Sequence, residues 1–332
     1  MIKPWCDRAN WRAKATEVAS TDSVAFLFPG QGSQYVGMGK ELCEHYSVAA
    51  QAFQEAEQTL GFSLRQLCFY GPEDDLQLTE NTQPAILAVS VAALRVLQSE
   101  TAVQPSYVAG HSLGEYSALV CVGALSFSDA LRIVRERGRL MQAAVPFGRG
   151  AMAVIIGLDM AAVSSICKEA EDGEVVAPAN YNGGGQIVIA GSKTAVARAM
   201  LLAKSDGAKR VIELPVSAPF HCPLMKPAAE GLKRILNDVM VHPFSVGVIS
   251  NVNAEVNLDA AQVKLLLAEQ AMRPVRWEES VHRLESLGML KMLEVGPGRV
   301  LKGLVKRISP KIEVDTFGAP QDLARILRND IT

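Results

Sequence analysis

The sequence lacks long hydrophobic runs: no stretch approaches the roughly 18 apolar residues that a membrane-spanning helix requires. Its first twenty residues carry charges throughout and have no apolar core of the kind found in secretory signals. The six cysteines form no C-x-x-C pair, so neither a zinc knuckle nor a redox motif is supported. These absences predict a cytoplasmic protein with reduced thiols, with no membrane segment and no metal site.

An excess of charge of one sign is missing as well. The chain has 33 Lys and Arg against 35 Asp and Glu, which are interspersed and leave a formal net charge of -2. No block of like charge indicates a nucleic acid or a membrane surface as a partner. An anionic ligand would therefore have to be bound by a few individually placed Arg or Lys side chains.

Apolar material for a core is plentiful. Hydrophobic residues make up 49% of the 332 residues and charged residues 20%, which is typical of a globular protein and excludes a disordered or fibrous one. This length suits one large α/β domain, or a large domain with a smaller one inserted.

The pattern along most of the chain is that of a parallel sheet covered by helices. Residues 24–28 form a continuous apolar run that stops at Pro29-Gly30, as a buried parallel strand ending in a tight turn does. Further strands are predicted at 107–109, 246–250 and 290–295. Helices are predicted at 41–60, 84–97, 128–145, 222–240, 260–272 and 280–287, and Ser128-Asp129 is the expected cap of the third.

The order of elements changes between residues 150 and 214. Strands are predicted at 151–156, 174–177, 186–190 and 210–214, with helices at 160–169 and 193–204, which is the βαββαβ order of a ferredoxin-like unit. We therefore predict an N-terminal extension at 1–22, an α/β catalytic domain at 23–147 and 218–332, and a ferredoxin-like subdomain at 148–217. The extension is either a helix docked through Trp5 and Trp11 or a tail. The cleft between the two domains is the expected ligand site.

A candidate nucleophile lies at Ser112, in Gly110-His111-Ser112-Leu113-Gly114. This matches G-x-S-x-G, a sharp strand-to-helix turn that presents a serine at a helix N-terminus. The glycines suit the crowded backbone of such a turn, and the free N–H of Leu113 could stabilise an oxyanion. The motif is short enough to occur by accident, although a predicted strand before it and a helix after it favour the functional interpretation.

A nucleophilic serine needs a base, and the chain has five histidines. His45 and His282 fall in charged helical stretches, and His242 precedes a proline at a turn. His111 adjoins the serine in a tight turn and should point away from it. His221 lies where the chain leaves the predicted subdomain and could face the serine across the cleft. The residues alone leave this assignment open.

Five motifs follow one another along the chain: Phe28-Pro29-Gly30-Gln31-Gly32-Ser33-Gln34, Gly110-His111-Ser112-Leu113-Gly114-Glu115-Tyr116, Arg137-Gly138, Ala218-Pro219-Phe220-His221 and Glu294-Val295-Gly296-Pro297-Gly298. In order and spacing they resemble the malonyl-CoA:acyl carrier protein transacylases and the related acyltransferase domains of polyketide synthases. The resemblance covers residues 24–308. It implies an α/β-hydrolase-like parallel-sheet domain with an inserted ferredoxin-like α+β subdomain.

The resemblance also implies roles for individual residues. Ser112 would be the nucleophile and His221 the general base. The backbone N–H groups of Gln31 and Leu113 would form the oxyanion hole. A backbone carbonyl near Gln270 would orient the imidazole in place of the usual acid.

Three further assignments follow from the same resemblance. Asn251 would lie close to the histidine and support it. Arg137 would bind the malonyl carboxylate, because a guanidinium can donate two parallel hydrogen bonds to it; residues alone do not distinguish it from the other arginines of its helix. Phe220 would crowd an α-methyl group and favour malonyl over methylmalonyl, with ordinary core packing as the alternative. Asn182, in a predicted Gly-rich hairpin, and Asn180 could lie at the edge of the cleft.

The expected reaction is a ping-pong transfer of malonyl from malonyl-CoA to the phosphopantetheine thiol of acyl carrier protein, through a malonyl-serine and with no metal or redox cofactor. A monomer is expected. An esterase or thioesterase would share the serine turn but would have no use for the arginine. A non-catalytic carrier-binding scaffold would not need serine, histidine and arginine together. A third alternative is an acyltransferase domain of a larger synthase, but the chain contains no ketosynthase or carrier sequence.

Overall fold

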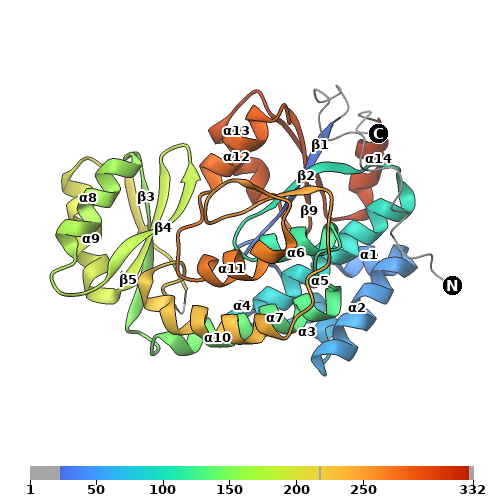
Figure 1. Ribbon diagram of the computed structural model, residues 1–332, viewed down its shortest axis with the longest axis horizontal. Helices are drawn as coiled ribbons and strands as arrows, with labels where there is room; N and C mark the ends of the chain where they lie inside the picture. The colour runs from blue at the N-terminus through green and yellow to red at the C-terminus, as the bar shows by residue number, and fades with distance from the viewer. Residues whose placement is uncertain (1–22, 217, 329–332) are drawn as a thin grey trace.

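The computed structural model describes residues 23–216 and 218–328, which form two lobes side by side (Figure 1). The extension at 1–22, with Trp5 and Trp11, lies outside the described residues. Within the described part of the chain, no helix is long and apolar enough to cross a membrane.

The larger lobe is built on a six-stranded sheet in the order β10-β9-β1-β2-β7-β8. Its strands pair in parallel except for β7 and β8, which are antiparallel. The strand bounds are β1 Val24–Phe28, β2 Pro105–Gly110, β7 Gly247–Ile249, β8 Val256–Asn257, β9 Lys291–Val295 and β10 Glu313–Phe317.

Helices cover both faces of this sheet, which explains why every residue of the central strand β1 is buried. Alternation along β1 points Phe26 and Phe28 into the core beneath α5 and α7, while Ala25 and Leu27 pack against α12 and α13 on the other face. The helices are α1 Lys40–His45, α2 Ser47–Leu60, α3 Leu64–Tyr70, α4 Glu73–Gln77, α5 Thr79–Glu100, α6 Gly114–Cys121, α7 Phe127–Ala144, the 3₁₀ turn η1 Pro223–Met225, α10 Lys226–Asn237, α11 Ala260–Gln270, α12 Trp277–Ser286, α13 Val300–Ile308 and α14 Pro320–Arg328.

The smaller lobe is a four-stranded antiparallel sheet in the order β4-β5-β3-β6. Its elements are β3 Gly150–Ile156, α8 Met160–Ala170, β4 Val176–Gly183, β5 Gln186–Ser192, α9 Lys193–Ser205 and β6 Arg210–Glu213, so the predicted βαββαβ order is confirmed. One face packs on α8 and α9, and the other packs on α7 and the segment around Phe220. The sheet lies inside the limits 148–217, and the domain boundaries themselves stay predictions.

Several predicted elements differ from the observed ones. The helix predicted at 41–60 is two helices, because Tyr46 between α1 and α2 is extended. The helix predicted from Pro84 begins one turn earlier at Thr79, with the proline inside it. The cap of α7 is Ser126, whose hydroxyl accepts from Asp129 N, and not Ser128. The helix predicted at 222–240 is η1 followed by a shorter α10, and α12 starts at Trp277 rather than at 280. α3, α4, β8, α13, β10 and α14 were not predicted.

The difference at β4 bears on the site. The sequence placed a strand at 174–177 and a Gly-rich turn at 182–185, whereas β4 continues to Gly183 and the turn is Gly184-Gly185. Asn180 and Asn182 therefore belong to β4, which pairs with β5. β4 is the edge strand that faces the larger lobe.

Candidate active site

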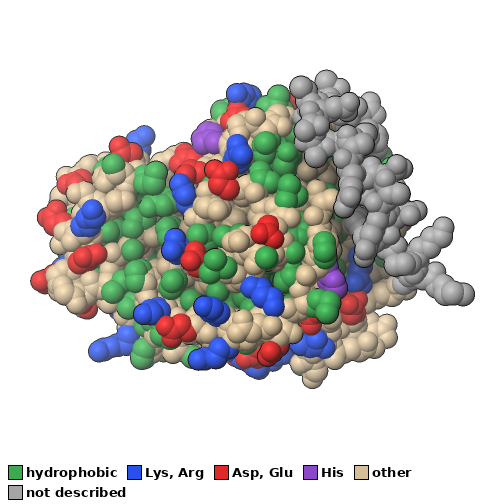
Figure 2. All heavy atoms as spheres, viewed as in Figure 1, with side chains coloured by type: hydrophobic (Ala, Val, Ile, Leu, Met, Phe, Trp, Pro, Cys, Tyr) green, Lys and Arg blue, Asp and Glu red, His purple; other side chains and the backbone are tan. Residues whose placement is uncertain are grey.

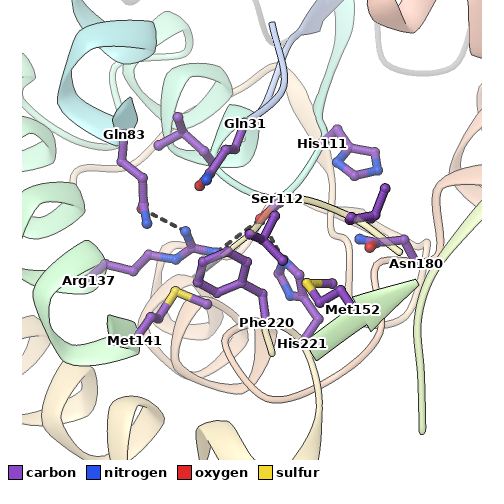
Figure 3. Close-up of a pocket in the computed structure, with 13 residues that line it drawn as sticks. Gln31, Gln83, His111, Ser112, Arg137, Met141, Met152, Asn180, Phe220 and His221 are labelled. Atoms are coloured by element: carbon purple, nitrogen blue, oxygen red, sulfur yellow. Dashed lines mark hydrogen bonds between the residues drawn. The ribbon is translucent and has the colours of Figure 1, made fainter. Parts of the chain in front are cut away.

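A pocket opens between the two lobes, where β1 and β2 of the large sheet end (Figure 3). Helix α7 and strands β3 and β4 supply its other walls. It is lined by Gln31, Gln83, His111, Ser112, Leu113, Arg137, Met141, Met152, Asn180, Leu214, Val216, Phe220 and His221.

Ser112 lies on a strained turn between β2 and α6. Its φ is 52°, in the left-handed region that non-glycine residues rarely adopt. A Cβ on Gly110 would lie 1.9 Å from the carbonyl carbon of Gly114, and a Cβ on Gly114 would lie 2.0 Å from Phe28 O. Only glycine fits at these two positions, which accounts for the spacing of the G-x-S-x-G motif.

The side chain of Asn251, just after β7, clamps this turn. Its Oδ1 accepts from Ser112 N at 2.7 Å, and its Nδ2 donates to Gly110 O at 2.7 Å. The side-chain hydrogen bonds of Asn251 in the described structure go to the serine turn and to Gln270, and none goes directly to His221. Any support of the histidine therefore passes through Gln270, whose backbone carbonyl contacts the imidazole.

His221 faces the serine, with Nε2 2.7 Å from Ser112 Oγ (Figure 3). Its Nδ1 lies 2.8 Å from the backbone carbonyl of Gln270. Because a carbonyl only accepts, Nδ1 carries the proton and Nε2 presents its lone pair to the serine. Burial, with the positive charge of Arg137 as the second cause, lowers the pKa of His221 to about 3. The imidazole is therefore neutral and able to accept a proton at physiological pH.

The other histidines are placed as the sequence predicted. His45, His242 and His282 are exposed. His111 turns away from Ser112 toward the smaller lobe, where its Nε2 lies 2.9 Å from Asn182 Oδ1. Asn182 thereby joins β4 to the serine turn.

The charge of this region comes from Arg137 on α7. The face shown in Figure 2 carries interspersed basic and acidic side chains with no extended patch of one sign. Arg137, by contrast, is 2% exposed and extends into the pocket. The next residue, Gly138, lets α7 lie close to α5, because a Cβ there would lie 2.6 Å from Glu80 Cα on α5.

All of the guanidinium's hydrogen bonds in the described structure go to neutral groups. Nη1 donates to Gln83 Oε1 at 2.7 Å, and Nη2 donates to Gln270 Oε1 at 2.9 Å and to Ser112 Oγ at 3.1 Å. No carboxylate within the described residues forms an ion pair with Arg137. A buried cation without a paired anion is costly, so the arrangement favours an anionic ligand beside Ser112.

Sequence reasoning missed the residues that hold Arg137 from α5. Gln83 Nε2 donates to Thr79 Oγ1 at 3.0 Å, and Thr79 Oγ1 donates to Gln31 Oε1 at 3.0 Å. This chain of side chains runs from the guanidinium to the turn after β1. Thr79 and Gln83 lie on the first turns of α5, and no signal in the sequence connects them with Arg137.

Gln31 and Leu113 both line the pocket, and their backbone N–H groups donate to no other atom of the described protein. Two such free donors beside a serine suit an oxyanion. Phe220 is 8% exposed and lines the same pocket as Ser112 (Figure 3). The same ring belongs to the core around Met152 and lines the pocket, so the structure is compatible with both interpretations drawn from the sequence.

The fold and the site together define an acyltransferase, and the comparisons agree. The family model described as the acyl transferase domain matches residues 25–311. The malonyl CoA-acyl carrier protein transacylase of Bacillus subtilis is 49% identical over 301 residues, which are 90% of this chain and 95% of the relative.

Solved structures are similar over the same region. An acyl carrier protein S-malonyltransferase from Vibrio cholerae superposes with a TM-score of 0.90 at 48% identity, covering 92% of this chain and 99% of its own. A malonyl-transacylase in complex with a type II polyketide synthase acyl-carrier protein gives 0.91 at 46% identity, covering 92% and 99%. This chain belongs to the malonyl CoA-acyl carrier protein transacylase family.

Proposed function

We propose that this enzyme transfers the malonyl group of malonyl-CoA to the phosphopantetheine thiol of an acyl carrier protein, through a malonyl ester of Ser112. The observation that carries this proposal is the buried guanidinium of Arg137, which forms no ion pair within the described residues and lies 3.1 Å from the serine oxygen. A malonyl group differs from acetyl by one carboxylate, and a carboxylate can accept two charge-assisted hydrogen bonds from a guanidinium.

In the first half-reaction His221 Nε2 takes the proton of Ser112 as Oγ attacks the thioester carbonyl. The N–H groups of Gln31 and Leu113 stabilise the tetrahedral oxyanion. The carbon–sulfur bond then breaks, and the coenzyme A thiol leaves with the proton held by His221.

The second half-reaction runs in the opposite direction. The carrier thiol gives its proton to His221 and attacks the malonyl ester, and Ser112 recovers a proton as the ester bond breaks. The protein's own side chains supply every proton transfer in this cycle. Transfer to a thiol in place of hydrolysis requires that the carboxylate, held by Arg137, keeps the ester out of reach of water.

Intact-mass spectrometry after a brief incubation with malonyl-CoA tests the proposal. The wild type should gain one malonyl group and lose it on addition of holo acyl carrier protein, while Ser112→Ala should gain none. Ser117→Ala is the matched control, because the Ser117 hydroxyl is buried on α6 and has no hydrogen-bond partner in the described structure. Release of coenzyme A without transfer to the carrier would identify a thioesterase instead. No adduct and no turnover would refute malonyl transfer.

A further inference from the structure

A buried carboxyl group at Glu115 lies behind the catalytic residues and has no part in the reaction described above. It is on α6, three residues after Ser112, is 3% exposed and does not line the pocket. Burial raises the pKa of this carboxyl to about 7. A carboxyl that is costly to bury should have a use that offsets its desolvation.

Two hydrogen bonds of the Glu115 carboxyl come from residues that hold the site. Glu115 Oε2 accepts from Gln270 Nε2 at 2.7 Å and from the backbone N–H of Asn251 at 3.1 Å. Asn251 is the residue whose side chain clamps the serine turn. Glu115 thus touches the supports of the nucleophile without touching the nucleophile's side chain.

Gln270 connects three parts of the site at once. Its backbone carbonyl accepts from the His221 imidazole, its Oε1 accepts from Arg137, and its Nε2 donates to Ser112 O at 2.9 Å as well as to Glu115. The amide works in only one orientation. A flip would place Oε1 against two acceptors, Glu115 Oε2 and Ser112 O, and would turn the NH₂ group toward the guanidinium.

We propose that Glu115 is a positioning residue for malonyl transfer: its carboxyl fixes the orientation of the Gln270 amide, and through that amide it holds the Arg137 guanidinium in register with the Ser112 turn. The role rests on the proposed function, since it concerns the group that binds the malonyl carboxylate. It predicts that loss of the acceptor at position 115 weakens malonyl recognition more than acetyl recognition.

Two substitutions at position 115 separate positioning from bulk stability. Glu115→Met keeps the length of the side chain but removes the acceptor. Glu115→Gln keeps a carbonyl oxygen that can accept from both Gln270 and Asn251. Misplacement of a reacting or anchoring group by about 1 Å costs on the order of 100-fold, so the Met variant should lose about that factor in kcat/KM for malonyl-CoA. The Gln variant should stay within about tenfold of the wild type, because hydrogen bonds of neutral acceptors are weaker only by about half.

A double-mutant cycle with Gln270→Ala shows whether the effect passes through the amide. This substitution removes the amide but leaves the backbone carbonyl that contacts His221. If Glu115 acts through Gln270, the effects of the two substitutions should not be additive. Glu115→Met should then lower kcat/KM by less than about tenfold in the Gln270→Ala background, compared with about 100-fold in the wild type. Glu294→Gln is the matched control: Glu294 is also buried, its carboxylate caps α13 through Leu301 N and Lys302 N, and it does not line the pocket.

Each outcome decides the proposal once the melting temperature shows that the variants are folded at the assay temperature. Rescue by Gln, a non-additive cycle and a larger loss for malonyl-CoA than for acetyl-CoA would support it. A Met variant with wild-type kinetics, multiplicative effects in the cycle, or equal losses for both donors would overturn it. Should the Met variant not fold, Glu115→Asp withdraws the carboxylate from Gln270 by one methylene and is judged by the same criteria. A wild type that forms no malonyl adduct would overturn the proposed function, and this inference with it.

Discussion

Replacing Arg137 by alanine should abolish the preference for malonyl-CoA and not merely slow the enzyme. Two charge-assisted hydrogen bonds to a carboxylate are worth about 1.5–3 kcal/mol each, or about 3–6 kcal/mol together. At about 1.4 kcal/mol per factor of ten, kcat/KM for malonyl-CoA should fall by about 10²–10⁴. Acetyl-CoA has no carboxylate to lose, so its kcat/KM should change by less than about tenfold.

The comparison of two donors separates the anchor from general damage. Arg137→Ala also leaves the Oε1 atoms of Gln83 and Gln270 without the hydrogen bonds that Arg137 donates. This damage to the folded site should lower the rates with malonyl-CoA and with acetyl-CoA to the same extent. The assay is therefore the rate of adduct formation with malonyl-CoA and with acetyl-CoA, measured by quenched-flow mass spectrometry. Arg132→Ala is the control, because Arg132 lies on the same helix but its side chain is 60% exposed. Equal losses for both donors in Arg137→Ala would refute the anchoring argument.

Two further predictions concern the residues on either side of this anchor. Phe220→Ala should open space beside Ser112 and raise kcat/KM for methylmalonyl-CoA relative to malonyl-CoA by about tenfold or more, since one methyl group is worth about 1–3 kcal/mol in a tight pocket. Competition assays measure this ratio, and an unchanged ratio would show that the ring acts only in core packing. The pH profile of kcat/KM should show no loss from protonation of His221 above about pH 5, because its pKa is lowered to about 3 and the neutral, proton-accepting form persists as the pH falls through 6.5. An acid limb near pH 6.5 that persists in Glu115→Gln would contradict this.

The sequence identified the parts of the site that depend on local backbone geometry. The serine turn was predictable because Gly110 and Gly114 leave no room for a Cβ, and the strand before it because its apolar residues are continuous. The βαββαβ order of the smaller lobe was predictable for the same reason, since periodicity and turn residues are local properties. Arg137 could be selected only through the family resemblance, because its helix carries four arginines.

Contacts between segments far apart in the chain were harder to predict from the sequence. The clamp of Asn251 on the serine turn was not predicted, since the sequence does not state which groups a side chain meets 139 residues away. Thr79 and Gln83 were missed because α5 begins before its proline, where pattern rules place the helix start. Glu115 stood inside a recognised motif, yet no role could be given to it.

The sequence by itself determined the two kinds of sheet, the strained serine turn and the family to which the chain belongs, because each of these follows from residue types at short, fixed spacings. Only the tertiary structure decided how the serine, His221 and Arg137 are held together. Their supports, the Gln270 amide and the carboxyl of Glu115, come from segments about 155 residues apart that meet through packing of α6 against the end of α11. The orientation of a buried amide depends on all of its donors and acceptors at once, and those are assembled only when the chain has folded.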